Sequence, residues 1–382
     1  MRRIAPVFFI LLSFLSSPVF ALTGKSVAEL NAFDTHMQDL MKRWNVPGAA
    51  LAVVRKGKLV LARGYGAASS GQEVQPYSRF RIASLSKLIT AAAILKLVEQ
   101  DKLKLDKQAL LYLLDLPGLV FDQTDRRWWD VTVRHLLQHR AGVATNDDQD
   151  PMFNTTASCH SIVKQYLSQP LQHNPGEHYL YSNFGYCVLG MIIQTVSGQS
   201  YENYVRSNIL EPANVGSMYL GGSNKARPGE HEVEYYSRDG QDPYGFNMHN
   251  LAAAGGWVAS VKELARLFSL LDGFDSRADM LSAKLMQQVP LRPAAVERHA
   301  EVWYGLGLGV RQRVDGQNWW HAGSLPGTRA LYVRAFDDTL WVALFNSRHK
   351  DSDAMLNDID QSLWRAREET RSWPQHDLFA AQ

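Results

Sequence analysis

The sequence predicts an α+β fold, an α/β sandwich whose antiparallel sheet is built from both termini and flanked by helices. Short apolar runs separated by turn signals occur near both ends of the chain, over residues 49–66 and 306–345, which is typical of antiparallel strands. Between roughly residues 100 and 300 the chain shows helical patterns and long loops rich in Asp, Asn, Gly and Pro. Strands at both ends with helices between them predict a mostly helical lobe inserted into one sheet.

The first 21 residues have the pattern of a secretory signal peptide. Arg2 and Arg3 precede an apolar run, and the small residue Ala21 stands at the expected cleavage site. The run is short for a membrane span, so membrane attachment is expected only if the segment stays uncleaved. We therefore predict a periplasmic or secreted protein, with one domain over residues 22–370 and a C-terminal tail over 371–382.

The charge balance argues against nucleic acid as a partner. The chain has 40 Lys and Arg residues against 38 Asp and Glu residues, and 46% of its residues are hydrophobic. Loss of the signal segment removes two arginines and no acid, which leaves 38 of each sign. A neutral chain with no basic stripe does not have the electrostatics of a nucleic-acid-binding protein.

Each expected element follows from a local pattern. Apolar residues at helical spacing predict an amphipathic helix over 27–44, and two apolar runs across a Gly-containing turn predict a hairpin over 49–66. Further helices are expected over 88–98, 133–138, 184–196, 261–271 and 354–365, and further strands over 306–310, 319–322, 330–336 and 340–345.

The helix that begins near Ser84 carries the first candidate for chemistry. Ser84 and Lys87 are three residues apart, so their side chains project from the same face of a helix. The run that follows is apolar nearly all round, which indicates burial. A buried amine loses proton affinity and becomes a base beside the serine. The spacing alone does not decide, because Ser161 and Lys164 repeat it.

Two other clusters are candidates to complete a site. Tyr181 and Asn183 stand at a loop-to-helix turn, where a phenol and an amide can face a pocket or simply pack and cap the helix. His321 ends a strand before a Gly-Pro turn, either as a pocket residue or as an ordinary edge residue. No G-x-S-x-G or H-E-x-x-H sequence occurs, so we expect neither an α/β-hydrolase nor a zinc enzyme, and no metal or other cofactor.

Three ordered motifs resemble those of a known family. They are Ser84-Leu85-Ser86-Lys87, Tyr181-Ser182-Asn183 and His321-Ala322-Gly323. They match the S-x-x-K, Y-x-N and K/H-x-G motifs of the class C β-lactamase and serine DD-peptidase group of penicillin-recognising serine hydrolases. The resemblance covers roughly residues 26–366 and implies a β-lactamase/transpeptidase-like fold. Three motifs in order favour Ser84 over Ser161 as the nucleophile.

The resemblance implies a catalytic role for three of these residues. Ser84 is expected to be acylated, while Lys87 and Tyr181 together take its proton, protonate the leaving group and activate the deacylating water. Which of the two is the primary base stays open at this stage.

The resemblance also implies a substrate-binding set. Asn183 is expected to hold the substrate amide, the backbone N–H groups of Ser84 and Ser324 to form an oxyanion hole, and His321 and Gly323 to line the pocket.

The third motif departs from the Lys-Thr-Gly that β-lactamases of this class usually carry. His321 and Ala322 stand where those enzymes have Lys and Thr. The expected activity is therefore that of an exported serine hydrolase acting on an ester, amide or peptide, with cell-wall peptide among its candidate substrates. The alternative is a penicillin- or peptidoglycan-binding protein that is acylated but turns over poorly.

The two cysteines, Cys159 and Cys187, leave two alternatives open. In an oxidising compartment they can form one disulfide, or they can stay unpaired as small buried residues.

Overall fold

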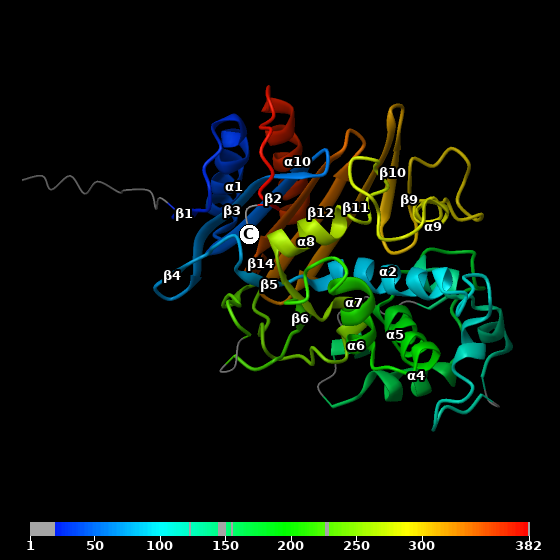
Figure 1. Ribbon diagram of the computed structural model, residues 1–382. Helices are drawn as coiled ribbons and strands as arrows, with labels where there is room; N and C mark the ends of the chain where they lie inside the picture. The colour runs from blue at the N-terminus through cyan, green and yellow to red at the C-terminus, as the bar shows by residue number, and fades with distance from the viewer. Residues whose placement is uncertain (1–19, 122–123, 144–149, 154–155, 226–228, 381–382) are drawn as a thin grey trace, which may run out of the picture.

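The main sheet of the molecule is antiparallel and is assembled from both ends of the chain (Figure 1). The computed structural model describes residues 20–121, 124–143, 150–153, 156–225 and 229–380; most of the expected signal segment lies outside them. In spatial order the strands are β1 (Leu22–Thr23), β3 (Lys58–Ser69), β2 (Gly48–Arg55), β13 (Thr339–Phe345), β12 (Thr328–Ala335), β11 (Gly316–Leu325), β10 (Gly309–Arg313) and β9 (Val302–Tyr304), with β4 (Gln72–Glu73) beside β3. The predicted fold class is confirmed.

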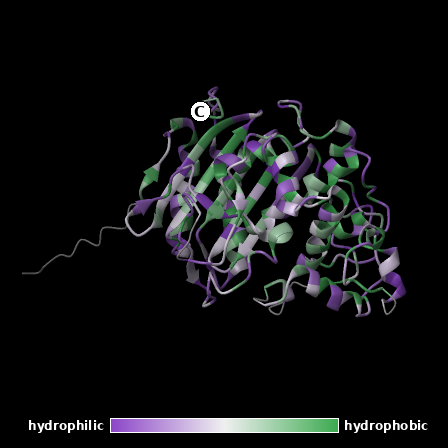
Figure 2. Ribbon diagram, turned by 60° about the horizontal axis from the view of Figure 1, so that its bottom comes forward, coloured by the Kyte–Doolittle hydropathy of each residue, from purple (hydrophilic) through white to green (hydrophobic). Residues whose placement is uncertain are grey.

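Alternation along the central strands gives the sheet two buried faces. Leu51 and Val53 of β2 lie opposite Ala343 and Trp341 of β13, and all four side chains bury on one face. The even-numbered residues of the same strands, such as Ala52, bury on the other face. The central strands are accordingly hydrophobic along most of their length (Figure 2).

Helices cover both faces. On the first face, α1 (Asn31–Trp44) and α10 (Ser352–Glu369) lie side by side (Figure 1). Arg43 of α1 donates two hydrogen bonds to Asp358 of α10, which joins the two ends of the chain. On the second face lie α8 (Val261–Phe268) and α2 (Ser86–Glu99). Ser260 caps α8, as its position before the apolar run predicts.

The inserted lobe packs against α2 from the side away from the sheet (Figure 1). Its helices are α3 (Val133–Leu137), α4 (Cys159–Leu167), α5 (Asn183–Ser197), α6 (Tyr201–Val205) and α7 (Ala252–Gly255), while α9 (Ala283–Met286) lies between the lobe and β9. Short turns of 3-10 helix cover Ala28–Leu30, Ala83–Leu85, Ala109–Tyr112, Arg126–Asp130 and Pro151–Phe153, and Arg206–Leu210 is a π-helical turn. No helix within the described ranges is both long and apolar enough to cross a membrane.

Two small sheets join the lobe to the main body. One holds β5 (Arg79–Arg81), β8 (Trp257–Ser260) and β6 (Tyr219–Leu220), and the other pairs β14 (Ser347–His349) with β7 (Tyr236–Arg238). The sequence did not predict these short strands.

The strand predicted over 306–310 is wrong in its first half. Gly307 has a left-handed φ of +87°, and a Cβ built on it would lie 2.6 Å from the Cβ of Ala91 in α2. The chain therefore bends here, and Leu306 and Leu308 are buried by this bend and not by strand alternation. The strand β10 begins only at Gly309, and the neighbouring strand β9 was missed.

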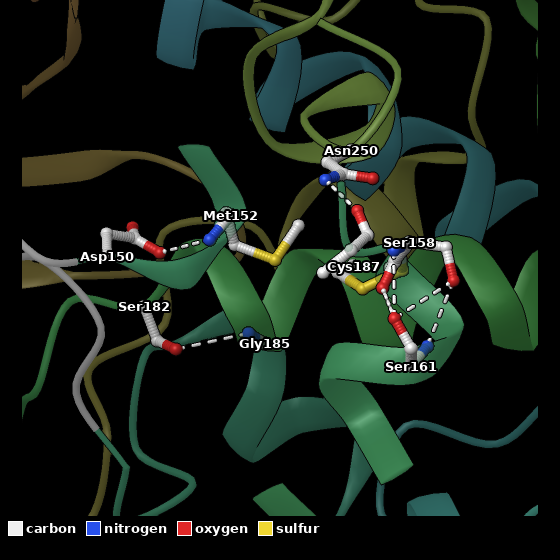
Figure 3. Close-up of a disulfide and its surroundings, with 10 residues drawn as sticks. Asp150, Met152, Ser158, Ser161, Ser182, Gly185, Cys187 and Asn250 are labelled. Carbon is white, nitrogen blue, oxygen red and sulfur yellow. Dashed lines mark hydrogen bonds between the residues drawn. A yellow bond between two sulfur atoms is a disulfide. The ribbon is translucent and has the colours of Figure 1, made fainter. Parts of the chain in front are cut away.

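The cysteines form a disulfide, which settles the question that the sequence left open. The bond joins Cys159 of α4 to Cys187 of α5, with their Cα atoms 6.0 Å apart (Figure 3). It ties two helices of the lobe together, and one of them, α5, begins at Asn183.

Candidate active site

Ser84 lies in the short 3-10 turn between β5 and α2. From Phe80 to Leu95 every residue is buried except Ser84, which is half-buried. Ala83 before it has a left-handed φ of +49°, a conformation that costs an alanine roughly 1–2 kcal/mol. Strain of this kind persists only where the surroundings hold it. The local structure thus exposes one hydroxyl from an otherwise closed segment.

Lys87 contacts three oxygen atoms and no solvent. Its Nζ lies 3.2 Å from Ser84 Oγ, 2.7 Å from Asn183 Oδ1 and 2.7 Å from the carbonyl oxygen of Ala254, and the side chain is fully buried. Burial lowers the pKa of the Lys87 ammonium well below its ordinary value, and the charge of Asp150 acts in the opposite direction. The amine is therefore biased toward its neutral form, as expected for a base.

Tyr181 contacts the serine from the other side. Its hydroxyl donates to Ser84 Oγ at 2.8 Å. Burial raises the pKa of the Tyr181 phenol, so the hydroxyl keeps its proton. The Tyr181 ring also lies 4.8 Å from Lys87 Nζ.

Asn183 links Lys87 to a carboxylate that the sequence analysis missed. Its Nδ2 donates to Asp150 Oδ2 at 2.7 Å, which leaves Oδ1 facing Lys87. Asp150 is only 5% exposed and also accepts from the backbone N–H of Met152. It stands in a stretch with several acidic residues, and nothing local distinguishes it from the others.

His139 holds the turn that carries Tyr181. Its carbonyl oxygen accepts from the backbone N–H of Leu180 at 2.7 Å, and its Nδ1 accepts from that of Ser182 at 3.1 Å. The two N–H groups that flank Tyr181 are therefore both bound to one residue. The His139 and Tyr181 rings lie 4.3 Å apart. Burial lowers the pKa of His139 well below its ordinary value, so its ring is neutral and Nδ1 is free to accept.

The third motif runs along an open stretch of strand edge. Strand β10 begins at Gly309, opposite Trp320, so the residues of β11 after Trp320 pair with β12 alone. Gly323 packs against the 3-10 turn that carries Ser84, because a Cβ at position 323 would lie 2.5 Å from the carbonyl oxygen of Ile82. The backbone of Ser324 is in phase with that of Trp320, so its N–H points to the open edge. The Ser324 hydroxyl itself accepts from Arg348 at 3.2 Å.

His321 is neutral and has both ring nitrogens occupied. Its Nδ1 donates to the carbonyl oxygen of Ala322 at 2.7 Å, so its Nε2 accepts from the Tyr304 hydroxyl at 2.8 Å. Burial, followed by the charge of Lys87, lowers the pKa of His321 to about 3. Tyr304 was also missed by the sequence analysis, because it sits at the end of a strand that was not predicted.

The alternative pair, Ser161 and Lys164, is a surface feature. Ser161 lies in the first turn of α4, where it forms a reciprocal capping box with Ser158 (Figure 3). Both Ser161 and Lys164 are exposed. The structure thus brings together Ser84, Lys87, Tyr181 and Asn183 and leaves Ser161 outside.

A half-buried serine that contacts a buried lysine and a tyrosine beside the edge of an antiparallel sheet defines a class, the β-lactamase-fold serine hydrolases. The family model described as Beta-lactamase matches residues 33–363, and the chain belongs to this family.

Solved structures show the same fold. A D-amino acid amidase from Ochrobactrum anthropi SV3 is 24% identical, with a TM-score of 0.73 over 90% of this chain and 100% of that one. An octameric penicillin-binding protein homologue from Pyrococcus abyssi is 23% identical, with a TM-score of 0.71 over 90% of this chain and 79% of that one.

The curated relatives are longer proteins. Protein flp of Staphylococcus aureus strain MRSA252 is 28% identical over 214 residues, which are 55% of this chain and 42% of the relative. A probable fimbrial assembly protein FimD of Dichelobacter nodosus is 29% identical over 201 residues, 51% of this chain and 49% of the relative. The matches thus span less than half the length of these relatives.

Proposed function

We propose that the protein is an exported serine hydrolase that acts through an acyl-enzyme on Ser84, with an ester, amide or peptide as substrate. The observation that carries the proposal is the position of Ser84 Oγ, 3.2 Å from the buried amine of Lys87 and 2.8 Å from the hydroxyl of Tyr181. A nucleophile within hydrogen-bond reach of a base is the arrangement that covalent catalysis requires.

The hydrogen bonds favour Lys87 as the base. A neutral amine has two N–H groups and one lone pair, and the two shortest contacts of Nζ, to Asn183 and Ala254, take the two N–H groups. The lone pair then faces Ser84 Oγ, which donates its proton. The opposite pKa shifts of Lys87 and Tyr181 support the same assignment, because one group is biased to be neutral and the other to stay protonated.

Acylation then proceeds with balanced proton transfers. Ser84 Oγ attacks the carbonyl carbon while its proton moves to Lys87 Nζ, and the N–H groups of Ser84 and Ser324 stabilise the oxyanion. The bond to the leaving group breaks as Tyr181 donates its proton to that group, and Lys87 returns a proton to Tyr181. Water then attacks the acyl-enzyme by the reverse sequence, which releases the acid and restores the Ser84 hydroxyl.

Tyr181 is the residue that links the proposal to class C β-lactamases, because it matches the tyrosine of their Y-x-N motif. The names of the solved neighbours make penicillin and amides of D-amino acids the first compounds to test. Export is supported by the N-terminal segment and by the Cys159–Cys187 disulfide, since disulfides persist in oxidising compartments.

The test is intact-mass spectrometry of the protein with a short-chain 4-nitrophenyl ester, a penicillin and a D-Ala-D-Ala peptide, while released product is followed. We expect turnover of at least one compound through a transient adduct that Ser84→Ala abolishes and Ser161→Ala leaves unchanged. Adducts that persist in Ser84→Ala would overturn the assignment. A permanent penicillin adduct without turnover would favour the alternative, a binding protein that is acylated but hydrolyses its acyl-enzyme poorly.

A further inference from the structure

Among the residues that the structure describes, no cation near Ser84 is free to bind an anionic substrate. Lys87 is biased toward the neutral form, and its three short contacts are to oxygen atoms already in place. A carboxylate that displaced one of these contacts would disrupt the base itself.

Three arginines near the site already donate hydrogen bonds to protein oxygen atoms. Arg348 lies beside Ser324, but its Nε contacts Asp239 at 2.5 Å and its Nη2 donates to Gln241 at 2.8 Å. Arg81, three residues before Ser84, is 1% exposed and donates to the carbonyl oxygens of Pro243 and Gly222. Arg140, beside the Tyr181 turn, is 7% exposed and donates to the carbonyl oxygens of residues 176 and 177.

The imidazoles do not supply a positive charge either. His321 uses both nitrogens, one on the carbonyl of Ala322 and the other on the Tyr304 hydroxyl. Protonation of Nε2 would force the Tyr304 hydroxyl to accept instead of donate, and it would place a charge in a buried setting. His139 accepts from Ser182 through Nδ1, and protonation there would break that bond.

A negative charge lies next to the cluster, and aromatic side chains form the outer wall of the site. Asp150 lies one side chain away from Lys87, through Asn183. Tyr304 and Tyr179 lie with ring centroids 5.7 Å apart, and Tyr179 is 46% exposed. A carboxylate entering here would lose its hydration without gaining a partner, which is strongly unfavourable.

We propose that this site selects uncharged acyl groups and rejects acyl groups that end in a carboxylate, and that the Tyr304–His321 pair is the wall that sets this preference. The inference rests on the proposed function. It adds the class of substrate, an ester or amide whose acyl group is neutral, whereas the proposed function states only the reaction.

The experiment compares two 4-nitrophenyl esters that differ in one group. One is the monoester of adipic acid, which carries a free carboxylate, and the other has that carboxylate replaced by a primary carboxamide of nearly the same shape. We expect kcat/KM for the carboxamide to exceed that for the carboxylate by at least about tenfold, because an unpaired charge adds a barrier of this order or larger. Equal rates, or a preference for the carboxylate, would overturn the inference.

A variant that adds a positive charge tests the assignment of the Tyr304–His321 wall. His321→Lys should raise the carboxylate-to-carboxamide ratio of kcat/KM by about tenfold, whereas the neutral His321→Gln should leave that ratio low. A ratio unchanged in His321→Lys would show that this wall does not meet the acyl end and would overturn its assignment. The ratio in the unmodified protein remains a test if either variant fails to fold.

Failure of the proposed function is distinguishable from failure of this inference. In the first case neither ester forms an adduct on Ser84, and in the second both do at similar rates.

Discussion

Replacement of His139 should slow acylation through Tyr181, without removing any group that the proposed reaction uses directly. His139 accepts from both backbone N–H groups that flank Tyr181, once through its carbonyl oxygen and once through Nδ1. Substitution leaves the carbonyl in place but removes the acceptor for Ser182. His139 also has a left-handed φ of +56°, so a replacement must tolerate that conformation.

The magnitude follows from these contacts. An orphaned Ser182 N–H costs about 1–3 kcal/mol, which is enough to let the turn shift. A misplacement of about 1 Å in a reacting group costs on the order of 100-fold in rate. We therefore expect kcat for acylation to fall about 100-fold in His139→Gly, with a smaller change in KM. In His139→Ala the backbone adds a further ~1–2 kcal/mol of instability, because alanine disfavours the left-handed region.

The matched control is His139→Asn, since asparagine tolerates a left-handed φ and its Oδ1 can accept where Nδ1 did. It should recover at least about tenfold of the rate lost in His139→Gly, as a buried hydrogen bond of this kind is worth about that factor. The assay is single-turnover acylation by a 4-nitrophenyl ester, with thermal melts to confirm folding. An equal rate in the Gly and Asn variants, or no loss in the Gly variant, would refute the reasoning.

Three further predictions concern charge and covalent structure. Asp150→Asn removes a charge that raises the pKa of Lys87, so the acidic limb of the pH dependence of kcat/KM should move to lower pH; an unmoved limb would contradict electrostatic coupling. Burial raises the pKa of Asp272 to about 7 in the folded protein, above its ordinary value of about 4. The folded state thus binds the proton more tightly, and this group's stabilising contribution is present below about pH 4 and lost as the pH rises to about 7. Asp272→Asn should therefore gain melting temperature over the parent at pH 8 and not at pH 4, as differential scanning calorimetry can check. Replacing Cys159 and Cys187 by serine opens a loop closed over a sequence separation of 28 and should lower the free energy of unfolding by about 2–4 kcal/mol in urea titrations, while Ser84 still accepts an acyl group; an unchanged unfolding midpoint would refute it.

Much of the fold could be predicted from the sequence because its main elements carry local signals. Strands β12 and β13 follow alternation and turn residues, and α5 is an apolar run with a serine cap. These local signals failed where residues are buried by contacts other than those of a strand in the sheet. Leu306 and Leu308 resemble strand residues, but they are buried because the chain bends against α2. The bend depends on Gly307, since a Cβ at that position would collide with Ala91.

Part of the candidate site could likewise be predicted from the sequence, and part could not. Ser84, Lys87, Tyr181 and Asn183 could be predicted because three motifs in order identify them, and the structure brings them within hydrogen-bond distance. The roles of His139, Asp150 and Tyr304 depend on contacts between segments that are 17 or more residues apart. Examples are the bond from Tyr304 to His321 and the bond from Asn183 to Asp150. No pattern near these residues contains that information.

The contacts of Lys87 explain why the site needs both lobes. Its Nζ meets Ser84 from the turn before α2, Asn183 from α5 and the carbonyl of Ala254 from α7. Because α5 and α7 belong to the inserted lobe, a loosened lobe would let water reach the amine and raise its pKa toward the ordinary value. The amine would then be protonated and could no longer accept the serine proton. Docking of the lobe against α2 therefore creates the base, and the burial that stabilises the fold is the same burial that prepares Ser84 for attack.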